Sequence, residues 1–137
     1  MPRNLLFLAV GIACGLGGAA AAFHHEDGEK VKVLSATDIT EKLNGKEATA
    51  TVVEVTIESG QAGLPHRHPG PGFGYVAEGE YEIGIDDQPT KVLKAGETFY
   101  EPTGCLHRVS KNASAKSRTR VIAVIVHPRQ ARDLCKS

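Results

Sequence analysis

Three histidines are the residues of this chain whose type and spacing best fit metal chemistry. His66 and His68 are separated by one residue, and on an extended strand two such residues point to the same face. At a rise of ~3.3 Å per residue their backbones lie about 6–7 Å apart, which suits two ligands on one ion. His107 comes much later, after the turn Pro102-Thr103-Gly104, and strands that close into a barrel would bring it opposite the first pair.

Short strands with tight turns between them would have to position these histidines, and the sequence supplies them. Val53, Val55 and Ile57 alternate with polar residues over 48–58, which is the period of a half-buried strand. An irregular segment with a turn of helix is expected at 38–45, and a short helix at 129–136. The other expected strands cover 31–36, 73–78, 80–85, 90–93, 98–101, 107–110 and 119–127. With 15 glycines and 7 prolines to form turns, the pattern predicts an all-β sandwich or barrel.

Two stretches around the histidines resemble the paired motifs of the cupin superfamily. The first runs from Gly60 to His68 and is followed by Gly79, and the second runs from Gly96 to His107. The resemblance implies a double-stranded β-helix, which is a form of jelly-roll barrel. We therefore expect a cupin barrel over 48–127, preceded by an N-terminal arm and edge strand at 23–47 and followed by a C-terminal tail at 128–137.

The sequence departs from the cupin motifs at two places. The glutamate of the first motif would fall at position 72, which is Gly72, and the asparagine of the second would fall at position 111, which is Lys111, with Asn112 following it. The resemblance thus implies His66, His68 and His107 as metal ligands, without the usual carboxylate. Three neutral imidazoles leave a divalent ion its full charge, so the site should favour an anionic ligand.

One divalent transition metal ion is the expected cofactor. Iron, manganese, nickel, copper and zinc all accept imidazole, so the ligands do not select among them. The resemblance implies that some three-histidine cupins cleave small molecules with dioxygen. A metal-dependent oxygenase acting on a small anionic substrate is therefore the first hypothesis. A non-catalytic periplasmic module that binds a small ligand or metal is the alternative, and a scaffold that dimerises is a third.

Several further residues are candidates for contact with a substrate. Tyr75 and Phe99 are plausible walls of a pocket, and Glu101 is an acid close to the second motif. No catalytic general base can be named from the sequence. Homodimers are common among single-domain cupins, so a homodimer is also expected.

The first 22 residues have the pattern of a secretory signal peptide. Arg3 precedes an apolar run at 5–10, and small residues end at Ala22. Cleavage after Ala22 would leave an exported chain, periplasmic or secreted, without a stable membrane span. The full sequence has 16 basic and 16 acidic residues and no lysine or arginine run, so nucleic acid is not an expected partner.

Two cysteines would remain after cleavage. Cys105 and Cys135 can form a disulfide in an oxidising compartment, but sequence alone does not bring their backbones together. Cys105 lies two residues before His107, which also allows a thiolate ligand to the metal. A buried, inert thiol is the third interpretation.

Overall fold

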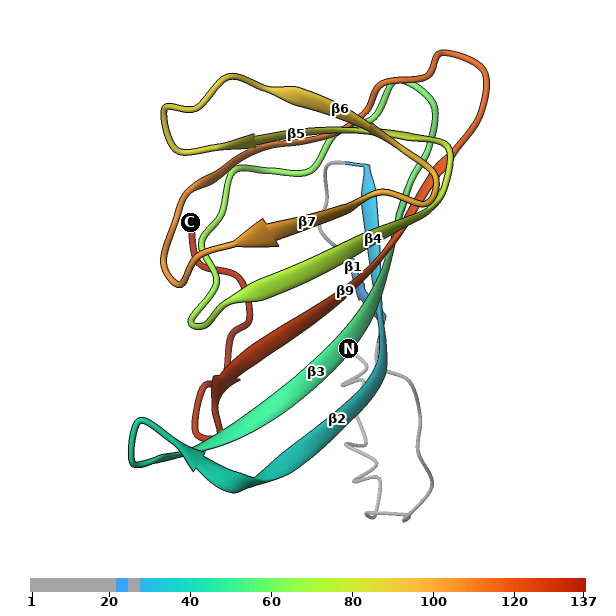
Figure 1. Ribbon diagram of the computed structural model, residues 1–137. Helices are drawn as coiled ribbons and strands as arrows, with labels where there is room; N and C mark the ends of the chain where they lie inside the picture. The colour runs from blue at the N-terminus through green and yellow to red at the C-terminus, as the bar shows by residue number, and fades with distance from the viewer. Residues whose placement is uncertain (1–21, 25–27) are drawn as a thin grey trace, which may run out of the picture.

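The computed structural model describes residues 22–24 and 28–137, which form nine strands and no helix (Figure 1). The predicted all-β class is confirmed. No helix in these residues is long and apolar enough to cross a membrane. The predicted signal peptide lies, apart from Ala22, outside the described residues.

Two antiparallel sheets make up the fold. The larger sheet has six strands in the order β1-β2-β3-β9-β4-β7, and the smaller has three in the order β6-β5-β8. In Figure 1 the small sheet lies at the top, and the large sheet runs from β7 beneath it down to β2. The strands are β1 (Ala22–His24), β2 (Glu29–Leu43), β3 (Lys46–Ile57), β4 (Gly72–Glu78), β5 (Glu80–Ile85), β6 (Lys91–Lys94), β7 (Thr98–Glu101), β8 (His107–Asn112) and β9 (Thr119–Pro128).

The long hairpin of β2 and β3 corrects one prediction. The segment at 38–45, expected to contain a turn of helix, continues β2 to Leu43 and pairs with β3. Asn44 and Gly45 have φ angles of 50° and 74°, the positive values that a two-residue type I′ hairpin requires. Asn-Gly between strand-forming runs is therefore a hairpin signal here, and residues 29–43 belong to the large sheet.

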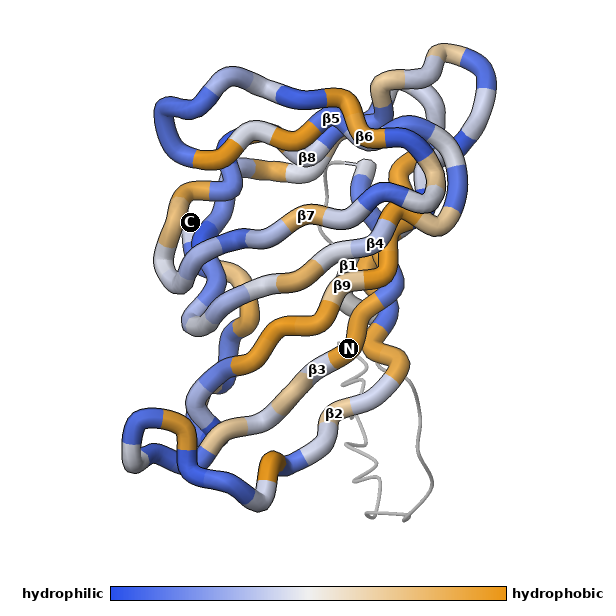
Figure 2. Tube along the Cα trace, in the orientation of Figure 1, coloured by the Kyte–Doolittle hydropathy of each residue, from blue (hydrophilic) through white to orange (hydrophobic). Residues whose placement is uncertain are grey.

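The core lies where the two sheets face each other. Ile57 of β3, Val76 of β4 and Val121 of β9 pack with Tyr81 and Ile83 of β5. Along β9 every second residue is buried, because one face of the strand meets the core and the other faces outward. Figure 2 shows the hydrophobic run along this strand. These contacts hold β5 against the large sheet. Because β8 pairs with β5, they also position His107, the first residue of β8.

The C-terminal tail forms turns and one isolated bridge, which corrects the helix expected at 129–136. Its backbone instead pairs with the segment that carries the histidines: Lys136 N donates to Arg67 O at 2.9 Å, and Arg67 N donates to Lys136 O at 2.7 Å. Such an exchange uses backbone groups that a helix would have to bond internally. The tail consequently lies beside His66 and His68.

Candidate metal centre

The three predicted histidines converge in the interior. His66 and His68 lie in the connection between β3 and β4, and His107 is the first residue of β8. His66 and His107 form an antiparallel bridge, with His107 N donating to His66 O at 2.8 Å and His66 N donating to His107 O at 3.2 Å. One ring nitrogen from each residue lies within 4.8 Å of the others, and all three residues are at least nine-tenths buried. The predicted convergence is confirmed.

Backbone carbonyls fix the protonation of two of the rings. His66 Nδ1 lies 2.8 Å from Leu64 O, and His68 Nδ1 lies 2.6 Å from Leu134 O. A carbonyl oxygen only accepts, so each Nδ1 must carry the proton and each Nε2 of a neutral ring presents a bare lone pair. The two Nε2 atoms face each other at 3.2 Å.

Two bare lone pairs at this separation fit a shared cation. Imidazole nitrogens bind zinc at about 2.0–2.1 Å, and two such ligands at tetrahedral or octahedral angles are about 2.8–3.4 Å apart. The Nε2 atoms of His66 and His68 have that separation, and their Nδ1 atoms have the carbonyl partners that orient metal-binding histidines in general. The donor set therefore suits a divalent transition metal.

A buried hydrogen-bond chain supports His107 from the side of β5. Tyr81 Oη lies 3.1 Å from His107 Nε2 and 3.0 Å from Ser110 Oγ, and Ser110 Oγ donates to Glu29 Oε1 at 2.8 Å. Burial raises the pKa of Tyr81 well above its usual range, so the phenol stays neutral. Tyr81 was not among the residues predicted from the sequence, because only the register of β5 with β8 brings it to His107.

Burial also keeps His66 neutral. Loss of hydration, followed by like charge on His107 and His68, lowers the pKa of His66 from 6.5 to about 4, although the hydrogen bond to Leu64 O opposes the shift. A neutral imidazole is the form that binds metal. His66 is thus ready to act as a ligand at neutral pH.

The metal-free protein is expected to lose stability as the pH falls from 6.5 to 4. In this window the unfolded chain protonates His66 and the folded chain does not, so the contribution of neutral His66 is complete above pH 6.5 and is lost on acidification. The shift corresponds to about 3 kcal/mol. Urea unfolding at a series of pH values checks this, and a His66→Gln variant should show a flatter dependence. Equal stability of the wild type at pH 7 and pH 4.5 would contradict it.

The three predicted substrate contacts occupy different places. Glu101 is 3% exposed and lies beside the histidines: its Oε1 is 2.7 Å from His107 Nδ1, and its Oε2 is 3.7 Å from His68 Nε2. Although burial alone would raise the pKa of Glu101, the rings of His107, His68 and His66 hold it below its usual range. The Phe99 ring packs on Tyr81 with centroids 5.4 Å apart. Tyr75 is 47% exposed.

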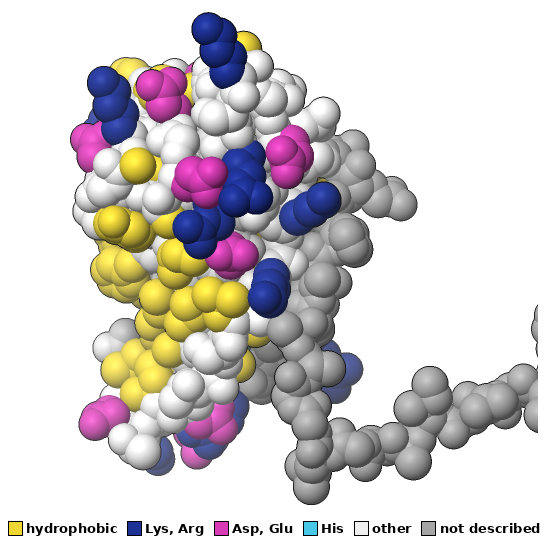
Figure 3. Space-filling model, turned by 90° about the vertical axis from the view of Figure 1, so that its right-hand side faces the viewer, with side chains coloured by type: hydrophobic (Ala, Val, Ile, Leu, Met, Phe, Trp, Pro, Cys, Tyr) yellow, Lys and Arg dark blue, Asp and Glu magenta, His cyan; other side chains and the backbone are white. Residues whose placement is uncertain are grey.

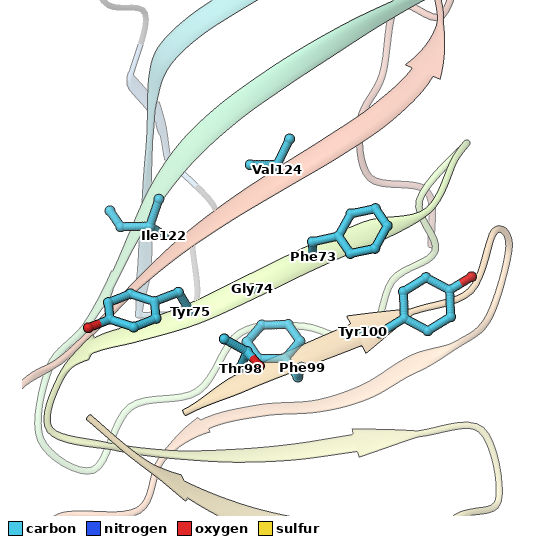
Figure 4. A pocket seen from close by; sticks show the side chains of 8 residues that line it. All are labelled: Phe73, Gly74, Tyr75, Thr98, Phe99, Tyr100, Ile122 and Val124. Carbon is cyan, nitrogen blue, oxygen red and sulfur yellow. The ribbon is translucent and has the colours of Figure 1, made fainter. Parts of the chain in front are cut away.

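Tyr75 lines an apolar groove along β9, β4 and β7. Figure 4 shows the groove, and Figure 3 shows hydrophobic side chains gathered on a face of the molecule. Its lining residues are Phe73, Gly74, Tyr75, Thr98, Phe99, Tyr100, Ile122 and Val124, none of which is a histidine. The groove is therefore separate from the histidine cluster, and contact of Tyr75 or Phe99 with a substrate stays a prediction.

Both described cysteines are free thiols rather than the disulfide that the sequence allows. Cys105 is buried, and burial raises its pKa. Burial raises the pKa of Cys135 to about 12. Cys135 Sγ lies 3.9 Å from His68 Nδ1, the nitrogen that faces Leu134 O, and so approaches the ring on the side away from His66. Among the described residues the group that could share one ion contains the three histidines and neither cysteine.

His127 is a buried histidine outside the cluster. Its Nε2 lies 2.9 Å from Thr51 Oγ1, and its Nδ1 lies 2.9 Å from Pro128 O. Both ring nitrogens therefore have partners within the large sheet. This is the structural role expected for a buried histidine that binds no metal.

Comparisons with known proteins agree with this fold. A family model described as a cupin domain matches residues 53–125, and no curated protein matches the chain. An uncharacterized conserved protein with a double-stranded β-helix domain from Klebsiella pneumoniae is 22% identical, with a TM-score of 0.61 over 84% of this chain and 90% of that chain.

Two structural neighbours are larger enzymes. An oxalate oxidase is 23% identical, with a TM-score of 0.59 over 80% of this chain, which spans 56% of the oxidase chain. Oxalate decarboxylase of Bacillus subtilis, described for its Mn(II) centres, is 20% identical, with a TM-score of 0.57 over 78% of this chain and 28% of its own. At these identities the likeness establishes the predicted double-stranded β-helix. Since the family model also covers more than half of the 137 residues, the chain belongs to the cupin family.

Proposed function

We propose that this cupin binds one divalent transition metal ion through His66, His68 and His107 and uses it to act on a small anionic substrate with dioxygen. One observation carries the metal: the bare Nε2 atoms of His66 and His68 face each other at 3.2 Å, while their Nδ1 atoms donate to carbonyls. A divalent ion held there supplies a Lewis-acidic centre that attracts a small anion.

The protein residues contribute orientation and exclusion of water. Leu64 and Leu134 hold the two rings through their carbonyls, and Tyr81 holds His107 through its hydroxyl. Because the three histidines are at most 9% exposed, a small substrate fits the centre better than a polymer. Oxalate is the first compound to test, since two of the structural neighbours are oxalate enzymes.

The decisive experiment is elemental analysis of the protein purified without a metal-affinity tag, followed by oxygen-consumption assays. About one manganese, iron, nickel, copper or zinc ion per chain is the expected result. The loaded protein is then mixed with oxalate and other small carboxylates under an oxygen electrode. Stoichiometric metal without consumption of oxygen or substrate would favour the non-catalytic binding module. Absence of metal, even after incubation with each ion, would overturn the proposal.

We also propose that the chain is exported after cleavage behind Ala22. The support is the order of charge, apolar run and small residues at 1–22, and the homodimer stays a prediction that rests on the family. Intact mass spectrometry of the protein recovered from its native host tests the cleavage, because a processed chain lacks the mass of residues 1–22. A full-length intracellular chain would contradict export.

A further inference from the structure

The space that a carboxylate ligand at position 72 would use is already filled by another residue. Gly72 of β4 pairs directly with Glu101 of β7, and both face the interior, since both are buried. A Cβ atom added to Gly72 would lie 3.0 Å from Glu101 Oε2 and 3.5 Å from Glu101 Cβ. A glutamate at 72 and one at 101 therefore compete for one volume, and this chain has the second.

The next residue pair along β4 and β7 also combines a glycine on β4 with a large side chain on β7. Gly74 pairs with Phe99, and a Cβ atom at Gly74 would lie 2.0 Å from Phe99 Cζ. Two glycines on the inner face of β4 thus give room to two large side chains from β7. Phe99 covers Tyr81, and Glu101 reaches the histidines.

The Glu101 carboxylate lacks the partners that a buried charge needs. In the described part of the chain its oxygens lie near His68 Nε2, at 3.7 Å, and His107 Nδ1, and near no lysine or arginine; the bare Nε2 of a neutral His68 gives it no proton. Its Oε1 and His107 Nδ1 are 2.7 Å apart, yet among residues 22–24 and 28–137 neither atom makes a hydrogen bond of acceptable geometry. A buried carboxylate costs several kcal/mol unless it is paired or coordinates a metal.

We propose that Glu101 is the carboxylate ligand of this metal centre, supplied from β7 in place of the one missing at Gly72. The inference rests on the proposed metal site. It changes that site in one respect: with Glu101 bound, a divalent ion keeps one net positive charge instead of two. The centre is then a weaker Lewis acid with one fewer open position.

Cobalt(II) titration of the metal-free full chain tests this assignment, followed by calorimetry and by the visible absorption of the bound ion. Glu101→Gln keeps shape and a hydrogen-bond acceptor but removes the charge. We expect its affinity for Co²⁺ to fall by at least about 10- to 100-fold, the range found when outer partners of metal ligands are lost, with a changed absorption spectrum. Glu97→Gln, an exposed acid before the same strand, should behave as wild type.

A double variant moves the carboxylate back across the sheet. Gly72→Glu combined with Glu101→Gly should recover most of the affinity, because the acid then starts from β4 and enters the same volume. A Glu101→Gln protein that binds Co²⁺ with wild-type affinity and spectrum would overturn the role of Glu101 alone. A wild-type chain that binds no Co²⁺ would instead overturn the proposed metal function, and this assignment with it.

Discussion

Replacing His66 with alanine is expected to abolish stoichiometric metal binding while the two sheets stay folded. When the 10–16 kcal/mol typical of a tightly bound zinc is shared among four ligands, each accounts for about 3 kcal/mol, which is more than about 100-fold in affinity. The truncation removes a ring that is 9% exposed but belongs to neither core cluster. Metal content after dialysis and circular dichroism of the same sample measure the two effects.

His127→Gln is the matched control for this variant. His127 is as buried as His66, at 6% exposed, but its ring nitrogens bond to Thr51 and to Pro128 O. Its replacement should lower stability and leave metal content unchanged. A His66→Ala protein that keeps one ion per chain would refute the ligand set. Equal loss of metal from both variants would mean that metal is lost through lower stability of the fold and not through loss of a ligand.

Gly70→Ala is expected to destabilise the protein by about 3 kcal/mol or more, near the upper end of overpacking effects. A Cβ atom at Gly70 would lie 1.6 Å from Val126 O, 2.7 Å from Val126 C and 3.0 Å from His127 Cα. These are backbone atoms of β9, so no side chain can turn away. Pro71 O also accepts a hydrogen bond from Val126 N at 3.0 Å, which holds the two segments together. Urea denaturation measures the loss.

Gly45→Ala is the control that separates this steric clash from the backbone strain of placing alanine at a positive φ. Gly45 has a positive φ of 74°, but a Cβ atom there meets nothing within 4 Å, so we expect a loss of about 1 kcal/mol. Because Gly70 follows His68 by two residues, Gly70→Ala should also weaken metal binding, whereas Gly45→Ala should not. Similar stabilities of the two variants would show that the connection before β4 can move away from β9.

The sequence predicted the three histidines and the strands well, because both depend on short-range patterns. Alternation placed β3, a strand-like run placed β9, and the residues framing His66, His68 and His107 matched two motifs of fixed spacing. The hairpin at Asn44-Gly45 was missed although its signal is local: the polar stretch before it was interpreted as irregular. There the strand pairing outweighs the weak hydrophobicity of residues 38–43.

The contacts that support the histidines could not be predicted, although Glu101 was a candidate residue, because these contacts depend on register between distant strands. Glu101 reaches His68 and His107 only because β7 pairs with β4 at Gly72, and Tyr81 reaches His107 only because β5 pairs with β8. Leu134 contributes a backbone carbonyl, for which no side-chain pattern exists. The available signal was Gly72 at the motif position of the glutamate. A glycine there leaves space that a side chain from a neighbouring strand can fill.

The carbonyl of Leu134 has a consequence for when the metal can be taken up. His68 is held by a residue 66 positions further along the chain, and Arg67 by Lys136 two positions beyond that. During synthesis the ribosome must release both before the ring of His68 is oriented, although the histidines themselves emerge much earlier. A nascent chain therefore presents three loosely held ligands, and the finished chain presents an organised set. If the proposed ion is bound, the compartment in which residues 134–136 reach the histidines, rather than the one in which translation begins, is expected to determine which ions are available to the site.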